Sequence, residues 1–477
     1  MNRLACVFLA VFVFLSCAVQ EYPVLGRDAI ENVAFFENHS EALVQWAKKG
    51  IRNAVLVNID THDDIRWMPA KKIEKLKCLC EKKDWAAIKE VDSVGDESLF
   101  NIGNFIYAAT KLRIIKEVYW IIPFAYFSKA DTKNPLKKFL RTYNFSEKDI
   151  KTFRIKDGCF CGSFHEIPLN ICGIEALPDI KKPLILSIDV DFFSPMAREY
   201  GLNKMSGIKV LFDALYKKKY KIQDALIAYS VNGGYLSAIN RWIGDQSAEV
   251  LRKPDMIYGT PPELWTVRQN ADIYYEGNKA DLLFELTERY LEKYQNEPSL
   301  MMYTAFAYYG TGNFERAFDC AKKACLINPG YCFGLADIGQ CLIDADRLPD
   351  AVKFFESAYS FCPGMNYRQK GFANALRKAG RYREALKYYE TYRSKNSSFP
   401  VDFLMGETFL LMGDEESALK HFNRGRKYLE IDHYAFVKYR IDADAILSAI
   451  EFYEKRGFSE YAGELKKSPK LKAMFED

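Results

Sequence analysis

The sequence is poor in histidine, which supplies only 5 of its 477 residues. It also lacks an excess of either charge, because 67 Lys and Arg face 63 Asp and Glu, for a formal net charge of +4. This near balance argues against nucleic acid as the main partner. A charged fraction of 27% beside 49% hydrophobic residues excludes a mainly disordered chain. We therefore expect a folded protein of two or three domains.

Hydrophobic runs long enough to cross a membrane are missing as well. The first apolar run, residues 4–15, has 12 residues, whereas a transmembrane helix needs about 20. The later run Val118–Phe127 has only 10 residues and contains Pro123. Because the first run follows Arg3, as in secretory signals, residues 1–16 are predicted to be the signal peptide of an exported protein.

The end of this segment, Phe14-Leu15-Ser16-Cys17, resembles a loose bacterial lipobox, in which the cysteine is lipidated. It predicts lipidation of Cys17 and a membrane lipoprotein of the bacterial cell envelope, held by its N-terminal lipid. The alternative is ordinary cleavage after Ala18, because Ser16 and Ala18 also fit the small-residue rule, and such cleavage leaves no anchor.

The 12 cysteines show no C-x-x-C spacing, which is the usual spacing in zinc and thioredoxin-type sites. Export permits disulfides, but the spacing does not indicate which cysteines pair. Five cysteines fall in the C-terminal repeats described next, where small core residues are expected: Cys320, Cys325, Cys332, Cys341 and Cys362.

The C-terminal third of the chain repeats with a period of 34 residues. Alanines recur at this period, with one interval of 33: Ala317, Ala351, Ala385 and Ala418. A glycine precedes three of them by five residues, and Asp346 takes that place in the second repeat: Gly312, Gly380 and Gly413. The pattern resembles that of tetratricopeptide repeats, in which small residues let paired helices approach and glycine closes the turn between them.

We predict four such repeats over 297–431, a helical linker or cap over 271–296, and capping helices over 432–477. Arrays of this kind bind a peptide or a protein surface in a concave groove. The predicted partner of this all-α solenoid is therefore a protein or peptide.

The remaining residues, 17–265, alternate short apolar runs with amphipathic stretches. The apolar runs predict parallel strands buried on both faces, at 32–36, 53–59, 118–122, 184–188 and 225–230. The stretches between some of these runs predict helices, at 40–49, 73–91 and 102–115. Alternating strands and helices indicate an α/β domain with a mostly parallel sheet.

Metal-binding residue types follow three of these strands. They are His39 after the first, Asp60, His62 and Asp64 after the second, and Asp189 and Asp191 after the fourth. Ligands bind beyond the carboxyl ends of strands in open parallel sheets, and alternate side chains leaving a strand point the same way. Carboxylate and imidazole suit manganese, magnesium or zinc. The alternative is a set of solvated acids, with His39 as a residue at the start of a helix.

In order and spacing, these segments resemble the metal motifs of the arginase/deacetylase superfamily, over about residues 25–265. The stretches 100–106, 118–123 and 189–194 are most similar to an uncharacterised arginase-like family within it. The resemblance implies two divalent ions, Mn²⁺ favoured and Zn²⁺ possible, bridged by Asp60 and Asp189. His39 and Asp64 would complete one site, and His62 and Asp191 the other. It also implies hydrolysis of a C–N bond in an amide or guanidino group.

The chain departs from the arginase pattern at Glu37-Asn38 and at Ser194, and it has no clear counterpart of the substrate-orienting histidine loop. His165, the one spare histidine of this domain, is a candidate catalytic residue, although a lone histidine is also common as a structural one. Asn232-Gly233-Gly234-Tyr235 resembles the glycine-rich loop of deacetylases, which implies that the Tyr235 hydroxyl stabilises an oxyanion. A turn that needs glycine for a positive φ explains the same segment.

Three functional hypotheses follow. The first is an exported, lipid-anchored, metal-dependent C–N hydrolase with a protein-binding repeat domain. The second is a noncatalytic tetratricopeptide adaptor lipoprotein with a degenerate arginase-like domain. The third is a metal-binding protein without turnover.

Overall fold

The computed structural model describes residues 21–93, 98–125, 133–143, 145–365, 368–395, 401–428, 443–468 and 471. The predicted signal peptide and Cys17 lie outside these residues, as does part of the predicted C-terminal cap. Over the described ranges, no helix combines the length and the apolar character that a bilayer span requires.

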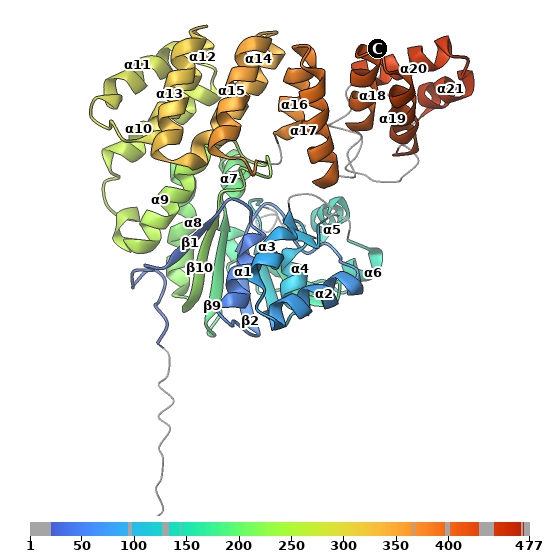
Figure 1. Ribbon diagram of the computed structural model, residues 1–477. Helices are drawn as coiled ribbons and strands as arrows, with labels where there is room; N and C mark the ends of the chain where they lie inside the picture. Colours follow the sequence, from blue (N-terminus) through green and yellow to red (C-terminus); the bar gives the residue numbers. More distant parts are fainter. Residues whose placement is uncertain are drawn as a thin grey trace, which may run out of the picture.

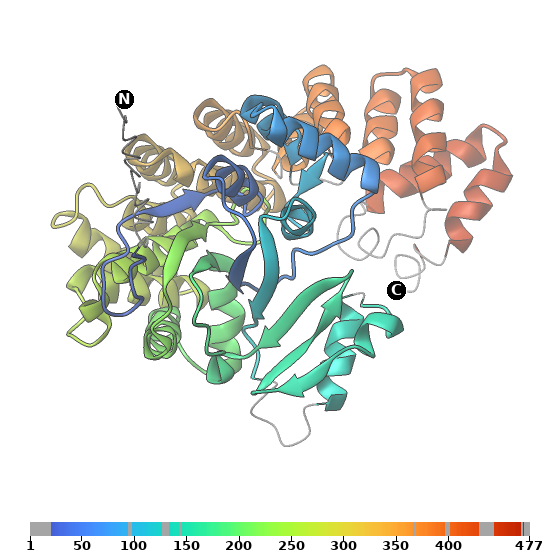
Figure 2. The same cartoon turned by 90° about the horizontal axis from the view of Figure 1, so that it is seen from below.

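An eight-stranded sheet, in the order β1-β10-β9-β2-β5-β8-β7-β6, forms the centre of the N-terminal half (Figures 1 and 2). Its strands are β1 Val33–Phe36, β2 Ala54–Ile59, β5 Ile115–Ile121, β6 Arg154–Lys156, β7 Cys159–Phe164, β8 Ile167–Cys172, β9 Leu184–Asp189 and β10 Ile222–Ala228. The strands from β1 to β8 in this order pair in parallel, and only β7 and β6 join antiparallel. The predicted mostly parallel sheet is confirmed.

Both faces of the sheet are covered, as the continuous apolar strands predict. Along β2, Leu56 packs in one core with Trp46 and Phe105, whereas Val57 packs in a second core with Leu211. The first core holds side chains from α1 (Glu41–Lys48), α3 (Trp85–Glu90) and α4 (Phe105–Lys111). The second holds side chains from α7 (Phe193–Tyr200), α8 (Lys204–Lys218) and α9 (Arg241–Arg252).

Two predicted helices differ from the structure. The helix expected over 73–91 is two helices, α2 (Ala70–Glu81) and α3, because Lys83 has φ +55° and the Asp84 side chain accepts the Ala87 N–H at the start of α3. The helix expected over 102–115 ends at Lys111, since β5 begins at Ile115. Further elements not predicted are β3 (Asp92–Ser93), β4 (Phe100–Asn101), α5 (Lys133–Thr142), α6 (Glu147–Ile150) and the strands β6, β7 and β8.

Beyond the sheet, the chain forms helix pairs stacked side by side (Figure 1). The predicted repeats correspond to α12 (Pro298–Gly310) with α13 (Phe314–Ile327), α14 (Cys332–Asp344) with α15 (Leu348–Phe361), α16 (Gln369–Lys378) with α17 (Tyr382–Lys395), and α18 (Val401–Leu411) with α19 (Glu415–Tyr428). Two more pairs flank them, α10 (Glu263–Glu276) with α11 (Ala280–Leu291), and α20 (Ala443–Lys455) with α21 (Ser459–Lys467). The predicted helical repeat array is confirmed.

The flanking pairs use the same turn as the central four. In all six, the turn holds a residue with positive φ: Asn278, Gly312, Asp346, Gly380, Gly413 and Gly457. Five residues later, each second helix places a buried side chain: Leu283, Ala317, Ala351, Ala385, Ala418 and Ala462. The first pair has no glycine or alanine at these two positions, so the residue pattern alone did not reveal it.

Two disulfides tie neighbouring elements together. Cys159–Cys172 joins β7 to β8, and Cys332–Cys362 joins the start of α14 to the residue after α15. Cys332 is a buried core residue, as expected, and Cys362 is partly buried against the same core; their disulfide was not predicted.

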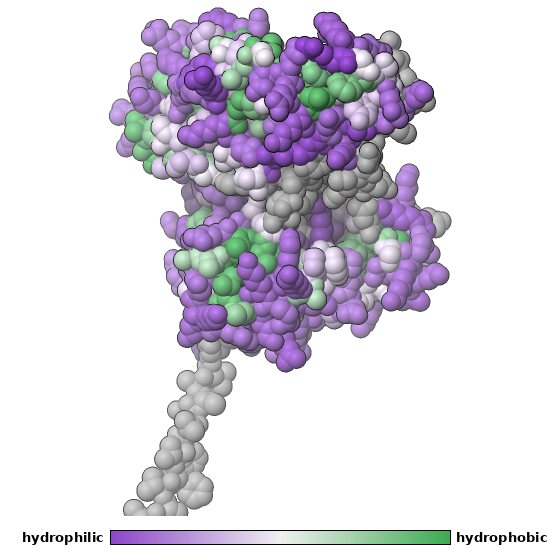
Figure 3. Space-filling view, turned by 45° about the vertical axis from the view of Figure 1, so that its right-hand side comes forward, coloured by the Kyte–Doolittle hydropathy of each residue, from purple (hydrophilic) through white to green (hydrophobic). Residues whose placement is uncertain are grey.

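The repeats lie against the carboxyl end of the sheet. Helices α12 and α14 contact the short 3-10 helix Ala238–Asn240 that precedes α9. The Trp242 Nε1–H donates to the Tyr303 hydroxyl at 3.0 Å, and the Ser237 hydroxyl donates to Asp337 Oδ2 at 2.7 Å. On the face drawn in Figure 3, hydrophilic side chains cover most of both halves and hydrophobic ones gather only in small patches.

Candidate metal centre

A pocket of about 90 Å³ opens at the carboxyl ends of β1, β2, β9 and β10. Its lining includes the predicted residues His39, His62, Asp64, Asp189, Asp191 and Tyr235. The lining also includes residues that were not predicted: Asp63, Arg66, Asn101, Ile102, Gly103, Tyr143 and Ser230. The sheet therefore brings together all six predicted metal ligands, because Asp60 lies beneath this lining and within 3.0 Å of His39.

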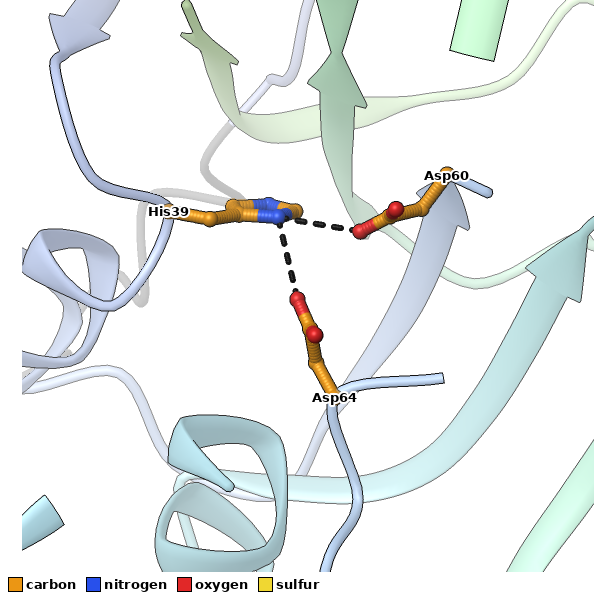
Figure 4. A group of neighbouring side chains, drawn as sticks. All are labelled: His39, Asp60 and Asp64. Carbon is orange, nitrogen blue, oxygen red and sulfur yellow. Dashed lines mark ion pairs between the residues drawn. The ribbon is translucent and has the colours of Figure 1, made fainter. Parts of the chain in front are cut away.

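One group of ligands surrounds His39, on the loop between β1 and α1 (Figure 4). His39 Nδ1 lies 3.0 Å from Asp60 Oδ2, 3.3 Å from Asp64 Oδ2 and 3.3 Å from Asp189 Oδ2. Among the described residues, this buried nitrogen meets hydrogen-bond geometry with none of the three oxygens that surround it. A nitrogen placed in this way fits a cation held among the oxygens.

The neighbours of His39 fix the orientation of its ring. The second nitrogen, Nε2, lies 2.6 Å from the Ser187 hydroxyl, and the ring packs on Phe105 with centroids 4.8 Å apart. Ser187 precedes Asp189 by two residues on β9, so the two side chains point to the same face. Partners of this kind are typical of metal-binding histidines.

A second group surrounds His62 on the loop after β2. His62 Nδ1 lies 3.0 Å from Asp191 Oδ2 and 3.7 Å from Asp60 Oδ1. Asp60 therefore belongs to both groups, with Oδ2 toward His39 and Oδ1 toward His62. Within each group, one ligand atom from every residue lies within 4.8 Å of the others.

Asp189 has a different arrangement. Its Oδ2 accepts the Ser230 hydroxyl at 2.5 Å beside His39, whereas its Oδ1 accepts the Asp191 N–H at 3.0 Å. Only one oxygen of Asp189 thus faces a ligand group directly. A bridging role for Asp189 stays a prediction.

The site is electrostatically costly without a cation. Burial, together with the charge of Asp189, raises the pKa of Asp191 to about 7, and burial beside Asp60 raises the pKa of Asp64 well above its usual value. Burial opposes protonation of His39, yet the surrounding carboxylates raise its pKa well above the usual range. The ionised forms of these buried, neighbouring carboxylates repel one another. A divalent cation bound among them would neutralise this repulsion.

Two of the described non-glycine residues with positive φ lie at this site. Asp64 has φ +51° and Ser230 has φ +53°, a region that residues other than glycine rarely adopt. Ser230 follows β10, and its hydroxyl donates to Asp189. Strain of this kind is commonly retained where function requires it.

Tyr235 reaches the pocket from the loop after β10. Its ring lies 4.8 Å from the His62 ring, edge to face, and half of the residue is exposed. Gly234 has φ +76°, and a Cβ on Gly233 would lie 2.9 Å from the Tyr235 ring. The glycines therefore serve the turn and also leave room for the tyrosine.

His165 does not reach this pocket. It lies in the turn between β7 and β8 with φ +49°, and its ring centroid is 4.0 Å from that of Phe164 and 6.0 Å from that of Tyr107. It is not among the residues that line the pocket. The prediction that His165 is catalytic is therefore not supported, because the antiparallel β7–β8 turn carries it away from the ends of the parallel strands that form the pocket.

Several of the additional pocket residues, Arg66 and Asn101 among them, carried a signal in the sequence. Arg66 closely follows the Asp60–Asp64 run, and Asn101 lies in the stretch 100–106 that carries the family resemblance. Tyr143 carried none, since it arrives from α5 and the segment after it, where its hydroxyl donates to the Thr61 carbonyl at 2.8 Å.

No protein-family model and no curated protein matches the chain. Among solved structures, MamA AMB-1 is 17% identical, with 34% of this chain and 98% of that chain covered and a TM-score of 0.28. YrrB, described as a TPR protein with an unusual peptide-binding site, is 17% identical, with coverages of 40% and 93% and a TM-score of 0.30. Similarity at this level carries no argument about the function of this chain.

Proposed function

We propose that the N-terminal domain is a metal-dependent hydrolase of a C–N bond in an amide or guanidino group. The observation that supports it most is the pair of His/Asp groups that share Asp60 at the bottom of an open pocket. A purely structural cluster of buried acids has no need of an opening to solvent beside it. Oxygen and imidazole donors in this number suit two divalent ions, with Mn²⁺ favoured and Zn²⁺ as the alternative.

Divalent ions at such a centre supply Lewis acidity and lower the pKa of bound water. The residues of this chain have their own roles. Ser187 and Phe105 hold the His39 ring, and Asp60 fixes the separation of the two groups. The Tyr235 ring lies beside that of His62, and its proposed role is to donate a hydrogen bond from its hydroxyl to the substrate oxygen as negative charge develops there.

The experiment combines metal content with turnover. Purified protein supplied with Mn²⁺ or Zn²⁺ is analysed for bound metal and then screened against amide and guanidine substrates. We expect bound metal and hydrolysis in the native chain, and loss of both in Asp60→Ala. In Tyr235→Phe, we expect bound metal to be retained and kcat to fall about 100-fold or more, which is typical for the loss of an oxyanion donor.

His165→Ala is the matched control, because it changes a histidine outside the pocket and should leave both readouts unchanged. Native protein that binds no metal contradicts the proposal and favours the noncatalytic adaptor. Bound metal without any turnover favours a metal-binding protein.

We also propose that the repeats bind a protein or peptide. In addition, we propose that the chain is an exported lipoprotein of the bacterial cell envelope, anchored through a lipid on Cys17. The two disulfides support an oxidising compartment. In a bacterial host, we expect Cys17→Ser to release the chain from the membrane fraction. Release of the unaltered chain would contradict the lipid anchor.

A further inference from the structure

Arg66 is the one arginine or lysine that lines the pocket. The other ionisable lining residues are the ligand candidates, Asp63 and two tyrosines. Over the described residues, no carboxylate forms an ion pair with the Arg66 guanidinium, and this side chain is exposed. The Arg66 guanidinium acts electrostatically on buried Asp63 but forms no ion pair with it, so its N–H donors are suited to an anion that arrives with the ligand.

The structure holds Arg66 in place. Its backbone N–H donates to the Gly103 carbonyl at 2.9 Å. Its side chain lies across Gly103, where an added Cβ would meet Cδ at 3.2 Å, Nε at 3.4 Å and Cζ at 3.6 Å. Because Gly103 has no side chain, the Arg66 guanidinium can pack against its backbone, next to the two groups of ligand candidates.

The nearby carboxylates have other roles. Asp63 Oδ1 accepts the Ile65 N–H at 2.9 Å, and Asp63 is buried. The four carboxylates of the ligand groups, Asp60, Asp64, Asp189 and Asp191, would balance the charge of two divalent ions. With those ions bound, Arg66 is the charge at the pocket wall that remains available to a ligand.

From this arrangement we infer that Arg66 selects substrates that carry a carboxylate in addition to the amide or guanidino group that is hydrolysed. The inference rests on the proposed function. The guanidinium offers paired N–H donors in the geometry that a carboxylate accepts. Arg66 is thus a specificity-determining residue, and the ion pair forms at the pocket wall while the scissile bond lies over the metal groups.

The test uses two hydroxamates of equal chain length, because hydroxamates bind divalent metals without turnover. Succinic acid monohydroxamate carries a carboxylate, and butyrohydroxamate is neutral. Binding to Mn²⁺-loaded full-length protein is measured by calorimetry. We expect the carboxylate-bearing probe to bind about tenfold more tightly or better, and Arg66→Gln to abolish the difference. Arg66→Lys should retain part of it, because lysine keeps the charge but not the fork of donors.

Arg198→Gln, at an exposed arginine on α7 outside the pocket, is the control and should preserve the preference. Equal binding of the two probes by the native protein overturns the inference on Arg66 and leaves the proposed function standing. A preference that persists in Arg66→Gln overturns it as well. Absence of bound metal together with absence of binding by either probe overturns the proposed function itself.

Discussion

Asp60 holds the two halves of the candidate metal centre together. It is fully buried, and the Asn58 amide donates to Oδ2 at 3.2 Å while the His62 N–H donates to Oδ1 at 2.7 Å. Burial opposes its ionisation, yet His39 and His62 lower the pKa of Asp60 below its usual value. A carboxylate that stays ionised between two imidazoles is available to two cations at once.

We therefore expect Asp60→Ala to lose both ions and His39→Ala to lose only one. The metal-to-protein ratio should fall from about two to near zero in the first variant and to about one in the second. Elemental analysis of the purified proteins measures it. Asp63→Asn is the matched control, because Asp63 shares the pocket but its oxygen accepts a backbone N–H that an amide also satisfies. A native ratio near one, unchanged in His39→Ala, would show that there is no second site.

Asp92, which interacts with Ser40 next to His39 but is not itself a ligand candidate, gives a prediction of pH dependence. Burial raises the pKa of Asp92 to about 7 from its ordinary value of 3.8. The folded state then binds more protons than the unfolded state between these values, so this group makes the protein less stable as the pH rises through that window. We expect Asp92→Asn to increase the free energy of unfolding by about 2–4 kcal/mol at pH 8 and by much less at pH 5. Urea denaturation at both pH values measures it, and an equal gain at both would contradict the assignment.

At the scale of elements, the repeat units share one turn with different residues in it. Glycine takes the left-handed position in four turns, while Asn278 and Asp346 take it in the other two, with φ +52° and +56°. Asn and Asp tolerate this region better than most residues but less well than glycine. The shared feature of the repeats is therefore the left-handed backbone conformation in the turn, which glycine, asparagine or aspartate can adopt.

This predicts opposite effects of two substitutions in equivalent turns. Asp346→Gly should stabilise the array by about 0.5 kcal/mol, and Gly380→Ala should destabilise it by about 1 kcal/mol. Thermal unfolding measures both. Gly364→Ala is the control, because Gly364 lacks a positive φ and an added Cβ there meets no atom within 4 Å. Destabilisation by Asp346→Gly would show that the aspartate side chain contributes more than the backbone strain costs.

At the scale of the whole molecule, Arg241 connects the sheet to the repeats. Its guanidinium pairs with Glu37 and lies 3.8 Å over the Tyr229 ring and 5.9 Å from the Tyr331 ring at the start of the second repeat. It also fills the space beside Gly330, where a Cβ would lie 2.4 Å from Cζ. Glu37 is one of the positions that departs from the arginase pattern. In this chain it pairs with Arg241 at the interface between the sheet and the repeats.

We expect Arg241→Leu to destabilise the protein by about 3 kcal/mol, because it leaves the Glu37 carboxylate largely buried without its partner. Replacing both residues, as Arg241→Leu with Glu37→Leu, should recover part of the loss. Denaturant unfolding followed by tryptophan fluorescence measures these effects. Unfolding unchanged in Arg241→Leu would show that the two halves are held by other contacts.

The sequence by itself determined the elements that depend on local pattern. Continuous apolar runs predicted β1, β2, β5, β9 and β10, because strands covered on both faces must be apolar throughout. The 34-residue period predicted the central repeats, and residues following strand ends predicted the six ligand candidates. The antiparallel edge at β6 and β7 was not predicted, and residues 271–296 were predicted only as a helical linker or cap, not as part of the repeat pair α10 and α11, since neither region has a distinctive local residue pattern.

Only the tertiary structure decided which distant residues meet. β10 and β9 lie between β1 and β2 in the sheet, so the loop after β1 must carry His39 across them to reach Asp60. The same long-range packing brings Tyr143 to the pocket and leaves His165 at a hairpin turn. Strand order and loop paths depend on contacts between residues far apart in the chain. The spacing of residues within a short segment does not predict those contacts.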